Sequence, residues 1–525
     1  MHSFEIEVDE PPTMELEFSE YDSAPLLASA SGKHQLRRGK RACAALLCSV
    51  CVSGCMFVVA LLLYSSSPWR TASWAKGLTH RQNHHNHHHH AEAIKGVLYY
   101  ELEPTPMTRL NPDRKWHNSA LAESMMLPSV GSDIAYDGKG HLVGLTDASP
   151  HFGIHCPTLD GGLQDNITGE DGITPLPLNG GKRKAKWLPF PDMAPAMVTL
   201  SLEGSLSLED DLQHHHHHHH DTALRMSFHS VATLTGTSGY KTTTRSPPLR
   251  QSPPPKFVVD KSCTTLVGDD PGGVDSEGIA GPLADGSFII GEEYAPSLLH
   301  VSSSGKIKKR YTPRNVELRD AYYTVRPILP RVVGVHMRPN RGFESSFQLP
   351  GVSGDMQACG IMQSPLGPKK HTKIVRICCV SLENDTLTGV YLLRLDHRKR
   401  MINSASTISS HEFIMLERHK GEGNIYKVDI RSATNVVDHE LMDTLAFEDP
   451  DFDFEEAGIA ILEKRSIFSY PNDYLDKRGI DLGTKLEGVT HIRNDTIVLV
   501  NDNDYGKHGH NPSIAFIIQF ERAFT

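Results

Sequence analysis

Short apolar runs separated by turn-forming residues cover most of the chain. From about residue 96 onward, runs of four to six mainly apolar residues alternate with Gly, Asp, Asn and Pro. Clear examples occupy residues 96–100, 287–290, 374–377, 390–393, 497–500 and 515–520. We find no sustained helical period beyond residue 64, so the pattern predicts an all-β region built from many short strands.

The longest apolar run lies earlier in the chain and predicts a membrane anchor. Residues 42–64 carry no charge, and these 23 residues suffice to cross a hydrocarbon layer of ~30 Å as a helix. Basic residues gather on the N-terminal side of the run, at Lys33, Arg37, Arg38, Lys40 and Arg41. Basic flanks stay cytosolic, so we expect a cytosolic tail over 1–41, a type II signal anchor, and a luminal or extracellular remainder. A buried helix of a soluble fold and a cleaved signal peptide are the alternatives, although the run exceeds the ~7–15 residues of a signal-peptide core.

The tail contains a candidate sorting signal. Asp22 stands four positions before the pair Leu26 and Leu27, a pattern similar to the dileucine signals that clathrin adaptors read. In an exposed tail this pattern indicates a clathrin adaptor as a partner. It also indicates an endosomal, lysosomal or vacuolar membrane, with the plasma membrane as the other destination on the secretory route.

Histidine-rich segments flank the first part of the β region. Residues 65–95 are polar, include His87–His90, and are predicted to form a stalk ahead of a domain over 96–525. A second run, His214–His220, lies within 205–253. We expect that segment to be largely a disordered insertion, with one strand near 226–234. Polyhistidine binds zinc or copper loosely, and low-complexity loop filler is the alternative interpretation.

Glycosylation acceptors, cysteines and charge refine the topology. Three Asn-x-Thr acceptors, Asn166, Asn384 and Asn494, all lie beyond the predicted anchor, in agreement with a luminal glycoprotein. The five cysteines beyond the anchor permit at most two internal disulfides, so the chain is not a disulfide scaffold. The formal net charge of −10 argues against nucleic acid as a partner.

A short acidic phrase recurs ahead of the predicted strands. Its copies occupy residues 275–279, 342–346 and 486–490, and each places a Glu beside small and apolar residues. Such recurrence predicts a radial all-β repeat, a β-propeller. At ~40–50 residues for each four-stranded blade, and after discounting the insertion and long loops, we expect six or seven blades. The last strand is expected to pair with the first, near Val97, because closure protects the sheet edges.

Several ordered pieces of the chain carry a family resemblance. They are Asp275-x-Glu277-Gly278-Ile279, Asp285-Gly286-x-Phe288, Glu292-Glu293-Tyr294-x-Pro296, Asn340-Arg341-Gly342-Phe343-Glu344, Met362-Gln363-Ser364-Pro365-Leu366, Lys485-Leu486-Glu487-Gly488-Val489 and Asn501-Asp502-Asn503-Asp504. A weaker upstream piece is residues 132–137 with Thr146-Asp147. Together, over residues 96–521, they resemble the Phytase-like family, also called "esterase-like activity of phytase", whose members are predicted β-propellers. The name links the family to alkaline β-propeller phytases, which implies calcium-dependent hydrolysis of phosphate esters, although the Arg-Asn-Asn and Asp-Val-Arg-Tyr motifs of those enzymes are absent here.

The recurring carboxylates suggest a cation site. If they face a shared channel they repel one another, unless protons or a cation intervene, and hard cations such as Ca²⁺ take carboxylate oxygens. We therefore predict catalytic Glu277, Glu344 and Glu487. Predicted metal ligands are Asp275, Glu293, Asp502 and Asp504, and predicted phosphate-binding residues are Arg341 and Lys485. The alternative is structural: acids beside Gly bind backbone amides at blade turns or pair with Arg of a neighbouring blade.

Two functions follow as hypotheses. The first is a metal-dependent hydrolase of a phosphate ester or a related ester. The second is a non-catalytic propeller that binds a protein or glycan partner. The chain has no Gly-x-Ser-x-Gly elbow, no P-loop and no His-Glu-x-x-His, which argues against α/β-hydrolase, nucleotide-hydrolase and zinc-peptidase chemistry.

Overall fold

The structure is a computed structural model. It describes residues 93–116, 118–157, 182–204, 224–237, 242–245, 258–259, 270–318, 321–351, 354–367, 372–483, 485–506 and 512–524. All of these belong to one compact unit, His89–Thr525. The predicted tail and anchor, most of the stalk, the sorting residues, Asn166 and the run His214–His220 lie outside the described residues. Within the described ranges, no helix is long and apolar enough to span a membrane.

Twenty of the strands form five four-stranded antiparallel units, which we number as blades in chain order. Blade 1 contains β2 Ile134–Tyr136, β3 His141–Leu145, β6 Ala196–Leu202 and β7 Leu224–Thr233. Blade 2 contains β9 Ser276–Ala280, β10 Phe288–Glu292, β11 Ser297–Val301 and β12 Ile307–Pro313, with β13 Thr324–Leu329 added in parallel. Blade 3 contains β14 Phe343–Pro350, β15 Met356–Met362, β16 Ile374–Ser381 and β17 Thr386–Arg394. Blade 4 contains β18 Met401–Thr407, β19 Glu412–His419, β20 Glu422–Asp429 and β21 Lys464–Tyr470.

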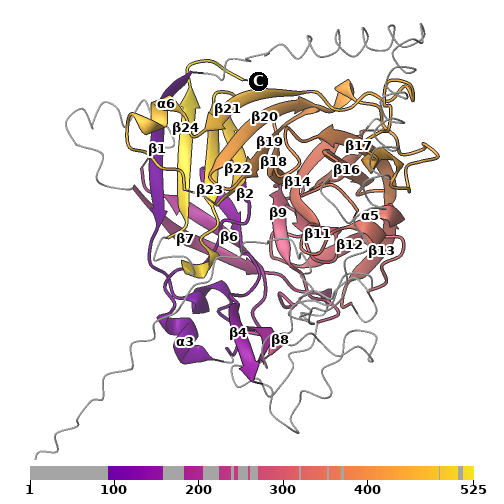
Figure 1. Ribbon diagram of the computed structural model, residues 1–525. Helices are drawn as coiled ribbons and strands as arrows, with labels where there is room; N and C mark the ends of the chain where they lie inside the picture. The colour runs from indigo at the N-terminus through magenta and orange to yellow at the C-terminus, as the bar shows by residue number, and fades with distance from the viewer. Residues whose placement is uncertain are drawn as a thin grey trace, which may run out of the picture. The chain divides into compact units, whose positions relative to one another are not determined.

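Blade 5 joins the two ends of the described chain. It contains β22 Leu486–Arg493, β23 Thr496–Asn501, β24 Ile514–Phe520 and β1 Ile94–Leu102. β1 pairs antiparallel with β24, with Val97 opposite Ile518, so the expected closure near Val97 is confirmed. Figure 1 shows indigo β1 beside yellow β24. On its other edge β1 pairs in parallel with β7, which merges blades 5 and 1 into an eight-stranded sheet.

Smaller elements lie in the connections. β4 Phe152–Pro157, β5 Lys182–Trp187 and β8 Val258–Val259 form a separate three-stranded sheet. The helical turns are η1 Met107–Leu110, α3 Ser119–Ser124, α5 Arg331–His336, η4 Ile430–Ser432, η5 Ala446–Glu448, α6 Asp473–Asp476 and η6 Asp504–Gly506. The strand expected near residues 226–234 is β7, so the segment predicted as an insertion contributes the outer strand of blade 1.

The predicted apolar runs form strands that are buried on both faces. Residues 288–290, 374–377 and 497–500 lie in β10, β16 and β23, whose side chains are almost all buried. A blade packs against a neighbour on each side, and this explains the continuous rather than alternating apolar pattern. Five hydrophobic clusters fill the five interfaces between successive blades, including the one between blades 5 and 1. One example is the stack of Phe347 of blade 3 on Phe413 of blade 4, with ring centroids 4.2 Å apart.

The expected six or seven blades are therefore wrong for the described residues, which close a ring with five. The connections use more chain than a typical blade repeat allows. Blade 1 contains the β4–β5 excursion between β3 and β6, and blade 4 has a long connection, residues 430–463, between β20 and β21. An average repeat length overestimates the blade count when loops are this long.

The innermost strands β2, β9, β14, β18 and β22 contact one another around the axis. Their approach is close: a Cβ placed on Gly278 would lie 2.7 Å from the backbone of Ser345. Asp133, fully buried beside β2, binds three of these strands. Its carboxylate accepts hydrogen bonds from the backbone N–H of Ile134 and of Ile279 (both 2.8 Å) and from the hydroxyl of Ser404 (2.5 Å). Burial raises the pKa of Asp133 well above its usual range, against the opposing effect of these donors.

This network leads to a stability prediction. Asp133→Ala removes the acceptor of the buried Ile134 and Ile279 N–H groups, at roughly 1–3 kcal/mol for each orphaned group, whereas the Ser404 hydroxyl keeps the Val489 carbonyl as an acceptor (3.2 Å). We expect the free energy of unfolding, from urea titrations followed by circular dichroism, to fall by about 3–5 kcal/mol. The matched control is Asp476→Ala, at an exposed position of α6, which should change it by less than about 0.5 kcal/mol. Equal effects of the two variants on the free energy of unfolding would show that the Asp133 network does not stabilise the ring of strands.

Candidate functional site

Acidic side chains from four blades gather at one mouth of the central channel. Glu277, Glu344 and Glu487 each occupy the second position of an innermost strand, in blades 2, 3 and 5. Glu293, Asp147 and Asp502 follow the ends of β10, β3 and β23. These second strands run antiparallel to the innermost ones, so their ends reach the mouth where the innermost strands begin.

A β-bulge sets each of the three glutamates. In the pairing of β9 with β10, Ser276 lies opposite Glu292 and Gly278 lies opposite Gly291, so Glu277 is the extra residue of the bulge and has no partner in the register. Glu344 and Glu487 are left over in the same way, in the pairings of β14 with β15 and of β22 with β23. A bulge adds one residue to a strand and redirects its side chain, and bulges are enriched beside active sites. The recurring acidic phrase of the sequence is the trace of this repeated bulge.

Two clusters of acidic side chains both include Asp147. Oxygens of Asp147, Asp275 and Glu277 lie within 4.8 Å of one another, and so do oxygens of Asp147, Asp502 and Asp504. Glu277 is 7% exposed, and no described group donates a hydrogen bond to its carboxylate. Burial raises the pKa of Glu277 well above its usual range, and the charges of Asp147 and Glu344 raise it further. A buried carboxyl with only acids around it favours a proton or a cation as its missing partner.

The second of these groups already contains a cation. The ammonium of Lys485 binds Asp502 and lies 2.8 Å from Asp504 Oδ1 and 3.7 Å from Glu487 Oε2. Burial alone would raise the pKa of Asp502, but Lys485 and the hydroxyl of Ser129 lower it to about 2. Asp502 therefore stays charged against Lys485, whereas no cationic side chain of the described residues pairs with Glu277.

Glu344 and Glu487 differ in their partners. A hydrogen bond joins the carboxyl groups of Glu344 and Glu293, and burial together with Glu293 raises the pKa of Glu344 well above its usual range. Glu344 therefore keeps its proton to a higher pH than an ordinary glutamate does. Glu487 instead binds Arg418 of β19. Burial still outweighs Lys485 and Arg418 and raises the pKa of Glu487 to about 7.

A buried ion pair fixes the backbone beneath these acids. Arg310 and Glu292 lie 3.1 Å apart and are both fully buried. The Glu292 carboxylate accepts hydrogen bonds from the backbone N–H of Asp275 (3.1 Å) and of Ala295 (2.7 Å). Glu292 therefore positions the segment that carries Asp275 and does not join the acids at the mouth. Removing one partner of such a pair is costly, so it acts as a rigid support.

The structure brings together all nine residues predicted for the site chemistry: Asp275, Glu277, Glu293, Arg341, Glu344, Lys485, Glu487, Asp502 and Asp504. Their catalytic, metal-binding and phosphate-binding roles remain predictions. Sequence reasoning missed Arg418, which no motif marks. It also left Asp147 out of the site, although the Thr146-Asp147 piece belonged to the resemblance. The basic residues Arg341, Arg418 and Lys485 each contact a carboxylate of the cluster.

Comparison with known proteins identifies the family. A family model described as Esterase-like activity of phytase matches residues 131–505, a span that includes every residue of the acid cluster. The chain belongs to the Phytase-like family. The resemblance carried by the acidic phrases is thus confirmed, and the all-β propeller expected for a Phytase-like chain is the fold observed.

Solved structures align with this chain only at low identity and low TM-score. NanB sialidase from Streptococcus pneumoniae aligns at 11% identity, with 76% of this chain, 57% of that chain and a TM-score of 0.27. Virginiamycin B lyase from Staphylococcus aureus aligns at 9% identity, with 81% of this chain, all of that chain and a TM-score of 0.27. The Dos1 propeller aligns at 8% identity, with 78% of this chain, 82% of that chain and a TM-score of 0.24. Scores this low carry no argument about activity, and no curated protein matches the Phytase-like chain.

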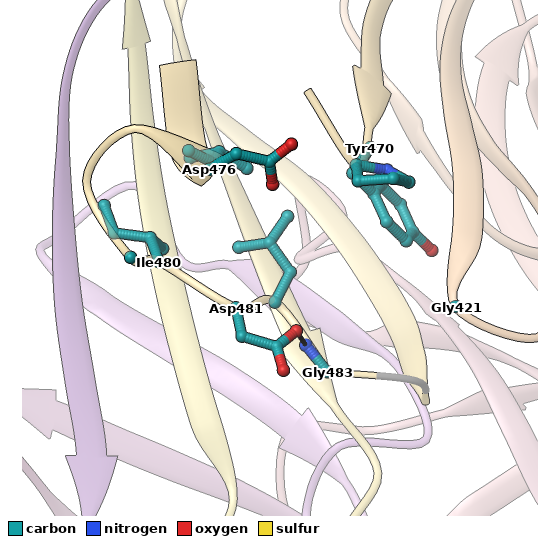
Figure 2. A pocket seen from close by; sticks show the side chains of 10 residues that line it. Gly421, Tyr470, Asp476, Ile480, Asp481 and Gly483 are labelled. Carbon is teal, nitrogen blue, oxygen red and sulfur yellow. Dashed lines mark hydrogen bonds between the residues drawn. The ribbon is translucent and has the colours of Figure 1, made fainter. Parts of the chain in front are cut away.

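Two cavities of the Phytase-like domain lie away from the acids. One, of about 300 Å³, has Tyr470 on one side and Asp476, Ile480 and Asp481 on the other (Figure 2). The other, of about 270 Å³, is lined by the far ends of the five innermost strands, including Gln348 and His491. It therefore marks the opposite mouth of the channel. Neither cavity includes a residue of the acid cluster.

The raised pKa values predict an inverse dependence of stability on pH. Glu277, Glu344 and Glu487 bind protons more tightly in the folded state than in the unfolded chain, so the protein without metal loses stability as pH rises through their folded pKa values. For Glu487, with a pKa near 7, the loss is on the order of 3 kcal/mol. We expect the melting temperature measured in chelator to fall between about pH 5 and pH 8.

Added Ca²⁺ should restore stability at the upper end of that range, because an ion can replace the lost protons. The control is Glu487→Gln, whose melting temperature should depend less on pH. A melting temperature that rises steadily over the same range in chelator would contradict the assignment of these pKa values.

Proposed function

We propose that this Phytase-like propeller is a cation-dependent hydrolase of a phosphate ester or a related ester. The convergence of Asp147, Asp275 and Glu277 from two blades supports the proposal, because their carboxylate oxygens lie within 4.8 Å of one another and Glu277 is buried with no cationic side chain paired to it among the described residues. Family membership supports ester hydrolysis as the class of reaction. The family description names an esterase-like activity, and here we assign that activity to the acid cluster.

The residues at the mouth fit a hard divalent cation. The group offers only carboxylate oxygens, which suit Ca²⁺ and Mg²⁺ rather than softer metals. Asp147, Asp275 and Glu277 would hold the ion, and Lys485 balances the charge of Asp502 and Asp504 beside it. Such an ion, when bound, polarises a phosphoryl or carbonyl oxygen and acidifies a bound water.

The remaining acids supply proton transfer. The raised pKa of Glu344 lets that residue hold a proton for a leaving group, and the raised pKa of Glu487 lets that residue accept a proton near neutral pH. Arg341 lies 3.5 Å from Glu293 and is 30% exposed, so it can turn toward a substrate oxygen. In this proposal the acid, the base and the cation would act at one mouth of the channel.

Turnover of generic esters tests the proposal. We expect the purified full-length protein to hydrolyse p-nitrophenyl phosphate or p-nitrophenyl acetate with Ca²⁺ or Mg²⁺ and to stop in chelator. Glu277→Gln and Glu344→Gln should each lower kcat by at least ~100-fold, the usual size of an acid–base or electrostatic contribution. The control is Asp285→Asn: Asp285 lies in the turn between β9 and β10 and pairs with Lys308, and this variant should retain activity. Turnover that persists in chelator and in both variants would reject the proposed mechanism.

A second candidate function is a non-catalytic binding module. The observation in its favour is that Arg341, Arg418 and Lys485 are already engaged by carboxylates, so none is reserved for a phosphate. This function predicts that Ca²⁺ raises the melting temperature without any turnover. It also predicts that a protein or glycan partner is recovered in stoichiometric amounts from membranes.

We also propose that the propeller is held on the luminal side of a membrane by the apolar run at 42–64. A disulfide between Cys359 and Cys379 supports an oxidising compartment. Asn384 and Asn494 are exposed, as glycan acceptors must be. The Leu26-Leu27 tail signal then assigns the protein to an endosomal, lysosomal or vacuolar membrane through a clathrin adaptor.

Glycan mapping tests this topology. We expect the protein from secretory cells to carry N-glycans, and Asn384→Gln and Asn494→Gln each to remove one of them in a gel-mobility assay with glycosidase. Both acceptors lie in exposed turns beside β17 and β23, so glutamine should leave folding unchanged. The orientation would be refuted if the wild-type protein carried no glycan and if protease added to the cytosolic side of intact membrane vesicles cleaved the propeller.

A further inference from the structure

The bulge that sets the three glutamates occurs a fourth time. In the pairing of β18 with β19, Ile402 and Ser404 are matched to consecutive residues and Asn403 is left over. Asn403 therefore occupies in blade 4 the position that Glu277, Glu344 and Glu487 occupy in blades 2, 3 and 5. In all four strands a small residue follows: Gly278, Ser345, Ser404 or Gly488.

Asn403 is fully buried and entirely unpartnered. Its exposed fraction is 0%, and neither its Oδ1 nor its Nδ2 meets a hydrogen-bond partner among the described residues. Most buried side-chain amides are paired, and leaving one unpaired costs roughly 1–3 kcal/mol. Because an unpaired amide at this bulge position destabilises the fold, we expect a bound partner to supply the missing hydrogen bonds.

The ring order separates this amide from the cation groups. Those groups draw on blades 1 and 2, and on blades 1 and 5, whereas blade 4 lies between blades 3 and 5. The shared bulge places Asn403 at the same end of its innermost strand as the glutamates, on a blade across the ring from blade 1. Unlike a fourth glutamate, an amide adds no negative charge and presents an N–H donor to an anion.

We propose that Asn403 is a substrate-binding residue whose side-chain amide donates a hydrogen bond to an oxyanion, such as a phosphate oxygen, held across the mouth from the cation group. The inference rests on the proposed function, because it presumes that an anionic ester enters this mouth. It explains why one of four equivalent positions is neutral. Among the four bulged positions, Asn403 would be the one neutral donor that an anion bridging to the ion meets.

Inorganic phosphate in the presence of Ca²⁺ is the probe. Calorimetric titration of the full-length protein should show Asn403→Ala weakening phosphate binding about tenfold, the effect of one lost hydrogen bond. Affinity for Ca²⁺ alone should not change. The melting temperature should stay level or rise, because the variant removes a buried polar group that has no partner. The matched control is Asn424→Ala in β20, where the amide already binds Tyr426 (2.7 Å), and phosphate affinity should not change.

The outcomes separate this inference from the proposed function. If wild-type protein binds Ca²⁺ and phosphate but Asn403→Ala binds phosphate equally well, Asn403 is not a ligand-binding residue and the cation site stands. If Asn403→Ala melts well below the wild type, the amide serves the fold through buried water, and the inference fails. If the wild type binds neither Ca²⁺ nor phosphate, the proposed function itself fails. Should Asn403→Ala not fold, Asn403→Ser, which keeps a smaller donor, must bind phosphate more weakly than the wild type for the inference to hold.

Discussion

The close packing of five innermost strands around one axis is the constraint on which the site depends. The strands approach so closely that Gly278 has no room for a side chain, and Asp133 ties β2, β9 and β18 together through buried hydrogen bonds. A narrow ring leaves the side chains at its mouth little room to lie apart from one another. Bulged residues of the innermost strands and the residues that end the second strands must therefore meet there.

That meeting creates an electrostatic imbalance. Eight carboxyl groups meet three basic side chains: Asp147, Asp275, Glu277, Glu293, Glu344, Glu487, Asp502 and Asp504 against Arg341, Arg418 and Lys485. Asp502 and Asp504 are neutralised locally by Lys485, whereas Glu277 has no donor among the described residues. Protons at low pH and a divalent cation at neutral pH are the two ways to relieve such repulsion. The same imbalance links stability, metal binding and the proposed chemistry.

Local sequence patterns predicted much of this arrangement. Apolar runs such as 374–377 specify buried strands, and the acidic phrases specify the bulges, so the fold class, the closure at Val97 and the convergence of Glu277, Glu344 and Glu487 were accessible. The blade count was not, because it depends on how much chain the loops consume. Arg418 was missed because its position in three dimensions, and not a sequence motif, marks it, and Asn403 was missed because its bulge carries an amide in place of the acid. Aligning Ile402-Asn403-Ser404 with the acidic phrases would have indicated the fourth bulge.

The most direct test of the account is a crystal structure grown with Ca²⁺ and measured for anomalous scattering. The account predicts one ion bound by Asp147, Asp275 and Glu277, at the ~2.3–2.6 Å typical of calcium–oxygen bonds. It also predicts that Lys485 remains between Asp502 and Asp504. An ion-free mouth at saturating Ca²⁺, with Glu277 turned onto an arginine or a backbone amide, would contradict the central claim.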